Sequence, residues 1–540
     1  MNNQLNLFGQ YGNAYDSSTN DEQQSYGVGQ ECPITNPTTP QLPSLSHYDY
    51  VGTHSGTTSE SGDKDSNEYL NSDRNPQLEP LQSRTPINNY IPHYDYSSIS
   101  SINSSFTGDT EHFETQVPVN YPRFQDQGKV IYIPTKVERI LNDRISKKRM
   151  EQIHPDVKVA IELTLLLLSN LSNAFYSSTN DGWKSLKAEY MRDQVSFTYA
   201  NTYRKILDLL IEGTSNGPII NVQKGYVIGQ KTRRYRLSDA YRNKGVVPYH
   251  LTTDMAVKLR KRAFFNALKS AISNPIALNC ISSYEQMELP SVDEVMAHGR
   301  TLAKEGYRNK KGLILTFQGK HSKTEFKNPE ERVWLEEQVE LYDRLTTEGL
   351  LVPRVADGRG GGRVVDSFTL MPAWIRSMVK MNGKTIEEYD YSCLHPNLAS
   401  QIFGGTGQAI THQQIADYLQ IDIVKAKVAN LSFFNSPLPQ MMNSVLWAYY
   451  SDNEPEMIKN LLAHRDASGL PTSEKHKATS QIMFETEVKL MTEVINRLND
   501  KGIYTMYLYD ALSAPAKNKT TIVDIMNQVA IDSGIATTAK

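Results

Sequence analysis

Two aspartates in the C-terminal half of the chain each end a run of strand-forming residues. Asp390 lies in "EEYDYSCLHPNLA" (387–399), and Asp510 lies in "MYLYDALSAP" (506–515). The residue pattern before each aspartate predicts one strand over 385–391 and another over 502–510. If those strands pair, the two carboxylates lie side by side. Paired carboxylates are the hard oxygen ligands that two Mg²⁺ ions, or Mn²⁺, need for phosphoryl transfer.

Basic side chains lie near both aspartates in the sequence. A loop over 358–363 holds four glycines in six residues, so its backbone and Arg363 can approach a ligand closely. Arg376 follows, and a predicted helix over 424–436 carries Lys425 and Lys427. We expect the arginines to contribute to substrate binding and the lysines to meet a triphosphate as point charges.

These segments, in this order, resemble the motifs of family A nucleic-acid polymerases, most closely a divergent branch found in phages and other mobile elements. The matching residues are Gly362-Arg363, Asn382-Gly383, Asp390-Tyr391-Ser392 with Leu394-His395-Pro396, Lys427 with Asn435, and Tyr509-Asp510. The resemblance covers about residues 355–520. It implies a palm with a small antiparallel sheet, two metal ions held by Asp390 and Asp510, and a fingers lysine, Lys427, on the incoming triphosphate.

The chain also departs from the family pattern. Tyr509 stands before Asp510 where the family usually has His. His395 stands where its DNA polymerases usually carry a Glu that rejects ribose, so the choice of sugar stays open. We expect His395 and Asn435 to contact substrate. The alternatives are that Asp390 is a turn or cap residue, that His395 is a structural histidine beside Pro396, and that Lys425 is a solvated helix charge.

The region before these motifs predicts a nucleic-acid-binding module. Three helices, the last over 199–213, precede two short basic strands within 217–238, which is the order of a winged helix. A structural subdomain or a protein-binding module would show the same order. The residues that we expect to contact nucleic acid are Arg204, Lys205, Lys231, Arg233, Arg234 and Arg236 here, and Gln481, with Glu485 nearby, on a predicted helix over 479–501.

Charge and composition divide the chain. Residues 1–120 carry three basic and fifteen acidic residues, so the other 420 residues hold a net charge of +9 out of an overall −3. An acidic tail on a basic body is typical of proteins that meet a polyanion, although it also suits a solubilising tail. Three scattered cysteines predict neither disulfides nor a zinc site. The apolar run over 163–171 is too short to span a bilayer and predicts a buried helix.

The sequence therefore predicts an α+β fold in four parts. These are an acidic disordered tail (1–125) that could dock a protein partner, a helical winged-helix-like module (126–250), a helical, thumb-like connecting region (251–354), and a palm with helical fingers (355–540). We expect a cytoplasmic, Mg²⁺-dependent nucleotidyltransferase acting on DNA template, primer and nucleoside triphosphates, as a DNA rather than an RNA polymerase. The alternative is a non-catalytic DNA-binding replication initiator or transcription regulator.

Overall fold

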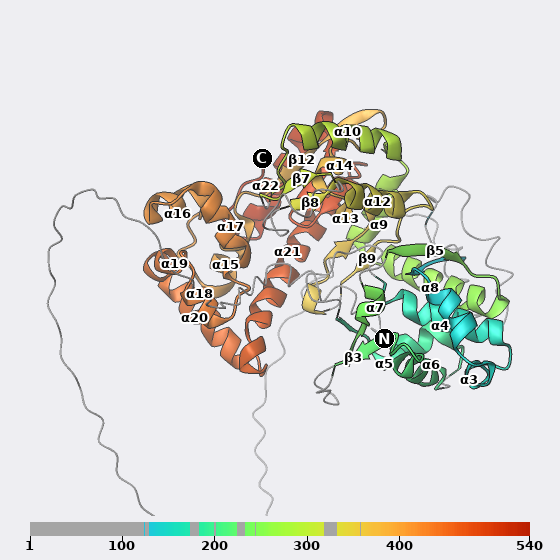
Figure 1. Ribbon diagram of the computed structural model, residues 1–540. Helices are drawn as coiled ribbons and strands as arrows, with labels where there is room; N and C mark the ends of the chain where they lie inside the picture. Colours follow the sequence, from blue (N-terminus) through green and yellow to red (C-terminus); the bar gives the residue numbers. More distant parts are fainter. Residues whose placement is uncertain are drawn as a thin grey trace, which may run out of the picture. The chain divides into compact units, whose positions relative to one another are not determined.

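The computed structural model describes Phe124 and residues 129–172, 183–198, 201–223, 233–242, 245–310, 312–317, 332–356 and 358–540. Helices and small, mostly antiparallel sheets alternate along this part of the chain (Figure 1). The predicted acidic tail, apart from Phe124, and Lys231 lie outside the described residues. No helix among the residues that the structure describes is long and apolar enough to cross a membrane.

The N-terminal module is built around one nearly all-apolar helix, α4 (Val157–Ser169). The Asp156 side chain caps it by accepting hydrogen bonds from the backbone N–H groups of Lys158 and Val159. Its apolar run is buried, as the sequence predicted. The helices around it are α2 (Val137–Arg144), α3 (Lys147–Glu151), α5 (Ala188–Val195), α6 (Thr202–Glu212) and α7 (Asp239–Arg242).

Two small antiparallel sheets complete this module. Strand β1 (Val130–Pro134) pairs with β5 (Val246–His250). A three-stranded sheet has the order β2-β4-β3, with β2 at Lys184–Ser185, β3 at Ile220–Val222 and β4 at Arg234–Leu237. Tyr235 and Leu237 of β4 face the core, so the arginines at 234 and 236 lie on its other face.

Helix α8 (Asp254–Ile272) belongs to two hydrophobic cores. Ala256 and Leu259 pack in the core of the N-terminal module, whereas Phe264 and Leu268 pack in the largest core of the chain. A side chain of Thr253 caps the helix at its start. Packing therefore continues across residue 250, where the sequence suggested a division.

The largest core surrounds a five-stranded antiparallel sheet of order β13-β14-β12-β11-β6. The strands are β6 (Met287–Glu288), β11 (Lys380–Met381), β12 (Lys384–Asp390), β13 (Met506–Leu508) and β14 (Ala511–Pro515). Strand β6 comes from the expected connecting region, so that region contributes an edge strand to the sheet. Two further pairs are β7 (Ile314–Thr316) with β8 (Arg332–Trp334), and β9 (Arg354–Val355) with β10 (Val364–Val365).

Helices cover this sheet and form a third core. Against the sheet core lie α9 (Pro275–Tyr284), α10 (Val292–Lys304), α12 (Leu335–Thr346), α13 (Ser367–Leu370), α14 (Ala373–Arg376), α21 (His476–Asn499) and α22 (Lys519–Asp532). The third core is formed by α15 (Leu394–Phe403), α16 (His412–Leu419), α17 (Ile423–Phe433), α18 (Leu438–Met442), α19 (Trp447–Asn453) and α20 (Pro455–Ala467), between β12 and α21 in sequence.

Candidate active site

A tight hairpin holds Asp510. Strands β13 and β14 pair with Leu508 opposite Ala511, so Tyr509 and Asp510 form a two-residue turn. Tyr509 has φ 61°, the left-handed conformation that such turns require and that is unusual for a bulky residue. The predicted strand over 502–510 is wrong in its bounds: β13 ends at Leu508, and Asp510 lies in the turn.

Strand pairing brings the two aspartates together. Strand β12 pairs with β14, and Asp390 lies opposite Ala511, the residue that follows Asp510. The pKa of Asp390 rises to about 7, because the carboxyl is buried and because Asp510 adds a like charge. Burial also raises the pKa of Asp510. The chain thus holds two carboxylates at the neighbouring ends of β12 and β14, at a cost in electrostatic energy.

A backbone oxygen is directed toward the same spot. The N–H and C=O of Asp390 both bond to the backbone of Lys540, and the N–H of Ser392 donates to Thr538. Successive residues of a strand direct their backbone groups to opposite sides. The backbone groups of Tyr391 therefore face β14. If the register of β12 and β14 continued by one residue, Tyr391 would lie opposite Asp510.

This oxygen-rich arrangement fits a hard divalent cation. Oδ1 of Asp390 is buried and has no hydrogen-bond partner within the described residues, and a buried acceptor without a partner is costly. A cation such as Mg²⁺ would satisfy Oδ1 and relieve the repulsion between the carboxylates. The described residues contain no group of three or more His, Cys, Asp or Glu side chains placed to hold a metal, so such an ion would have this pair of carboxylates as its side-chain donors.

Behind the aspartate pair lies a buried ion cluster of Arg363, Glu487 and His395. Glu487, on α21, is fully buried. Arg363 donates two hydrogen bonds to its carboxylate, one of them from Nε to Oε1 at 2.7 Å. Nε2 of His395 lies 2.8 Å from Oε2 of Glu487. When Nε2 carries the proton it donates to Glu487 and cannot also accept from Arg363, which lies 3.2 Å away.

The pKa values of the cluster reflect this pairing. Burial alone would raise the pKa of Glu487, but Arg363 and His395 lower it to about 2. Burial alone would lower the pKa of Arg363, and Glu487 more than reverses that effect. The guanidinium also lies over the rings of Phe484, at 3.7 Å, and Tyr509, at 5.0 Å. Arg363 therefore supports the turn that carries Asp510.

The sequence analysis missed Glu487. A usable signal was present, because the buried face of α21 runs through Met483, Phe484, Leu490 and Met491 at helical spacing, and Glu487 is an acidic residue on that face. An acidic side chain on an apolar stripe predicts a buried partner of opposite charge. The two polar residues that were noted on this helix, Gln481 and Glu485, instead hydrogen-bond to each other at 2.9 Å.

The remaining predicted substrate contacts lie in different settings. Nη1 of Arg376 donates to the Met371 carbonyl at 2.6 Å, and burial lowers the pKa of this arginine. Asn435 accepts a hydrogen bond from Ser480 at 2.7 Å. Lys425 and Lys427 are exposed on α17.

Lys427 acts electrostatically on Cys393 and His412, two residues that follow Asp390 in the sequence. Sγ of Cys393 lies 3.5 Å from Nδ1 of His412. Burial lowers the pKa of His412 to about 4, and the charge of Lys427 adds to the effect. Burial raises the pKa of Cys393 to about 12, which is typical of an unreactive thiol. Lys427 is thus within electrostatic reach of a segment that begins three residues after Asp390.

The basic residues of the N-terminal module are partly committed to its own structure. On α6, Nζ of Lys205 donates to the Gln152 carbonyl at 2.8 Å, and Arg204 is exposed with Nε bonded to the Tyr203 hydroxyl. On β4, Arg234 donates to the Trp183 carbonyl, and Arg236 stacks on the Trp183 ring at 4.8 Å. Arg233 is exposed just before β4.

The matches of this chain to known proteins are with solved structures. No protein-family model and no curated protein matches the chain. Among solved structures, the chain is similar to the POL domain of Pol1 from M. smegmatis in complex with DNA primer-template and dNTP, at 8% sequence identity and a TM-score of 0.30, over 52% of this chain and 71% of that one.

Proposed function

We propose that the chain is a template-directed nucleotidyltransferase that extends a 3′-hydroxyl with nucleotides, as a DNA polymerase of family A type and of its divergent phage or mobile-element branch. The observation that carries the proposal is the placement of Asp390 opposite Ala511, the residue after Asp510, together with a buried oxygen on Asp390 that has no partner among the described residues. The sequence motifs supply the family type, and the geometry of the carboxylates supports the chemistry.

In this proposal each part of the chain has a defined task. Asp390 and Asp510 would hold Mg²⁺ or Mn²⁺, which would supply activation of the attacking hydroxyl and stabilisation of charge on the transferring phosphate. Glu487 and Arg363 hold the turn that carries Asp510 in place. Lys427 and Lys425 offer positive charge to a triphosphate from α17.

The other predicted contacts belong to the same proposal. Arg376 and Asn435 are proposed to contact the substrate, and Gln481 lies on α21 beside Gly358 of the glycine-arginine loop. His395, held by Glu487, would select the sugar of the incoming nucleotide. The ratio of deoxynucleotide to ribonucleotide incorporation by His395→Ala and wild type tests that role, and equal ratios would remove it.

Nucleotide incorporation on a primed DNA template tests the function. Wild type, Asp390→Asn and Asp510→Asn are compared with Mg²⁺, with Mn²⁺ and with EDTA, and Asp524→Asn serves as the matched control because Asp524 is exposed on α22. We expect incorporation by wild type and Asp524→Asn only, and only with metal. Metal-dependent incorporation that survives in a folded Asp390→Asn, Asp510→Asn double variant would rule the proposal out.

A second candidate is a non-catalytic DNA-binding initiator or regulator. It is favoured by one observation: α4, β2, α5, α6, β3 and β4 follow one another in this order, with sheet order β2-β4-β3, which is compatible with the winged helix that the sequence predicts. In that arrangement α6, with exposed Arg204, would enter the major groove. Tight duplex binding that Arg204→Ala weakens, together with no Mg²⁺ binding and no incorporation, would favour this candidate over the polymerase.

A further inference from the structure

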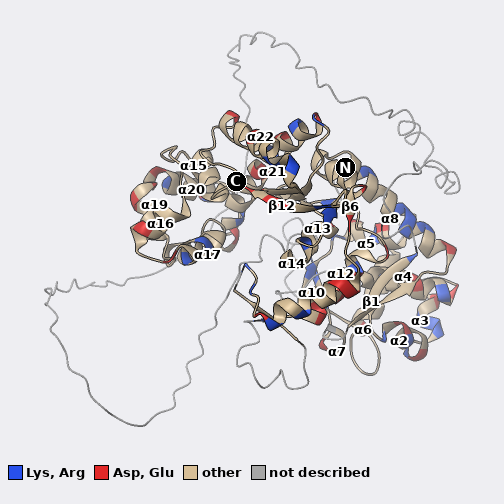
Figure 2. Cartoon of the chain, turned by 90° about the horizontal axis from the view of Figure 1, so that it is seen from above, with Lys and Arg blue, Asp and Glu red and all other residues tan. Residues whose placement is uncertain are grey.

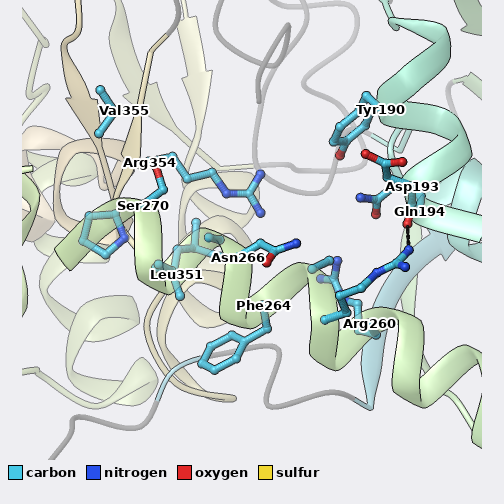
Figure 3. Close-up of a pocket in the computed structure, with 15 residues that line it drawn as sticks. Tyr190, Asp193, Gln194, Arg260, Phe264, Asn266, Ser270, Leu351, Arg354 and Val355 are labelled. Atoms are coloured by element: carbon cyan, nitrogen blue, oxygen red, sulfur yellow. Dashed lines mark hydrogen bonds between the residues drawn. The ribbon is translucent and has the colours of Figure 1, made fainter. Parts of the chain in front are cut away.

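A cleft with a basic lining lies between α5 and α8. Its volume is about 300 Å³, and residues 351–355, which lead into β9, close one side. Arg354 and Asn266 point into it (Figure 3). Tyr190, Asp193 and Gln194 of α5 lie on the opposite side. This volume is at the lower end of small-ligand sites and suits a single nucleotide unit rather than a duplex.

One arginine builds the wall of the cleft. Nη2 of Arg262 donates to the backbone carbonyls of Asp193, at 2.6 Å, and Ser196, at 2.7 Å, and its guanidinium lies 4.6 Å from the Phe197 ring centre. These bonds tie α8 to the end of α5. Arg262 is therefore a structural tether that keeps the two sides of the cleft in place.

Two other arginines give the cleft its charge. Arg260 comes from α8, whose Lys and Arg residues are blue in Figure 2, and Arg354 comes from β9. No carboxylate among the described residues forms an ion pair with Arg354. Asp193 is the acidic residue in the lining, against the basic side chains of Arg260, Arg262 and Arg354, so the lining favours an anion.

The cleft is connected to the aspartate pair through one hairpin. Arg354 on β9 lies opposite Val365 on β10. Arg363 is two residues from Val365, a separation of about 7 Å along an extended strand. Arg363 in turn lies against Tyr509, next to Asp510. A strand of nucleic acid in the cleft would therefore reach the proposed metal site within a few nucleotides.

We infer that this cleft binds the phosphodiester backbone of single-stranded nucleic acid, with Arg260 and Arg354 on phosphates and Asn266 and Gln194 supplying polar contacts. An electropositive groove of this kind, with an aromatic side chain such as Tyr190 in its lining, is how proteins bind single strands without reading sequence. The use that the chain makes of the bound strand rests on the proposed function, whereas the binding itself does not.

Fluorescence anisotropy of a labelled oligothymidylate, with the full chain in EDTA, tests the inference. Each of Arg260→Ala and Arg354→Ala should weaken binding about 5-fold at 0.1 M salt and reduce the slope of log affinity against log salt by about 0.7, the loss of one phosphate contact. Arg354→Lys should keep most of the affinity. The matched control is Lys258→Ala, an exposed residue of the same helix outside the lining.

The outcomes separate this inference from the proposed function. The inference would be overturned if an Arg260→Glu, Arg354→Glu double variant bound oligothymidylate as tightly as Lys258→Glu does. Both variants must keep the unfolding temperature of wild type for this comparison. The inference would also be overturned if the chain bound duplex more tightly than single strand and if substitution of Arg260 and Arg354 left that binding unchanged. A failed incorporation assay by wild type together with cleft-dependent oligothymidylate binding would reject only the polymerase.

Discussion

The guanidinium of Arg363 and the fully buried carboxylate of Glu487, 124 residues apart in the chain, form a two-point ion pair. The pair joins the glycine-arginine loop to α21. Because the same guanidinium lies against Tyr509 in the turn before Asp510, the pair also fixes the position of the second aspartate. The stability and the proposed chemistry of this site therefore depend on the same contact.

Glu487→Gln should destabilise the fold strongly. The change leaves the Arg363 charge buried without its counter-charge, and breaking a buried pair in this way costs about 3 to 5 kcal/mol. Urea unfolding followed by circular dichroism measures the loss. Glu485→Gln, two residues before it and only partly buried, is the matched control and should change stability by less than about 0.5 kcal/mol. Equal effects from both variants would contradict the assigned role.

The same pair predicts a specific pH dependence. The pKa of Glu487 is lowered from 4.5 to about 2 in the folded chain, so the unfolded chain binds the extra proton between these pH values. The contribution of the ionised Glu487 to the free energy of unfolding is complete above about pH 4.5 and is lost as pH falls toward 2. It amounts to about 3 kcal/mol. The difference in unfolding free energy between wild type and Glu487→Gln should shrink over this range, and a constant difference would refute the assignment.

Asp390→Asn should stabilise the metal-free chain while removing its response to Mg²⁺. The variant removes a buried charge that Asp510 repels, so its free energy of unfolding in EDTA should exceed that of wild type by roughly 1 to 3 kcal/mol. Its unfolding temperature in EDTA should be higher for the same reason. Mg²⁺ should raise the unfolding temperature of wild type and not of the variant, because only wild type binds the ion. Scanning calorimetry in EDTA and in Mg²⁺ provides both readings. A variant less stable than wild type in EDTA would count against the repulsion.

Gly361→Ala should disrupt the loop that carries Arg363. A Cβ at Gly361 would lie 2.3 Å from the Phe484 Cβ and 2.7 Å from the Glu485 backbone nitrogen, so either the loop or α21 must move. The matched control is Gly469→Ala, which has a similar positive φ but no atom within 4 Å of the new Cβ. We expect about 1 kcal/mol of destabilisation for the control from backbone strain alone and at least twice that for Gly361→Ala in urea unfolding. Equal losses would show that the contact with α21 does not matter.

Local sequence patterns predicted the helices and strands near the site but not the residues at which they begin and end. The helix predicted over 199–213 forms as α6 and stops at Gly213, whose φ of 65° suits glycine. The strand predicted over 385–391 forms as β12. The strand predicted over 502–510 proved much shorter, because its residues through Thr505 are not in a strand and Tyr509 enters the turn. A turn with a tyrosine at positive φ has no composition signal of the kind that glycine or asparagine gives.

Long-range contacts were harder to predict. The adjacency of Asp390 and Asp510 was conditional on strand pairing, which depends on contacts between segments 120 residues apart. The edge strand at 287–288 is only two residues long and leaves no periodic pattern. Glu487 was missed because its partner is distant in sequence, although its place on an apolar helix face marked it as unusual.

Helix α8 has a practical and mechanical consequence. A fragment that ends at residue 250 would lose Ala256 and Leu259 from the N-terminal core, and a fragment that starts at 251 would expose the same two side chains to water. Division of the chain at that point would therefore damage the N-terminal core. A continuous 19-residue helix also bends little, so any rearrangement of the N-terminal module would be transmitted along α8 to the cleft and to the sheet. The two cores would then move together rather than as independent domains.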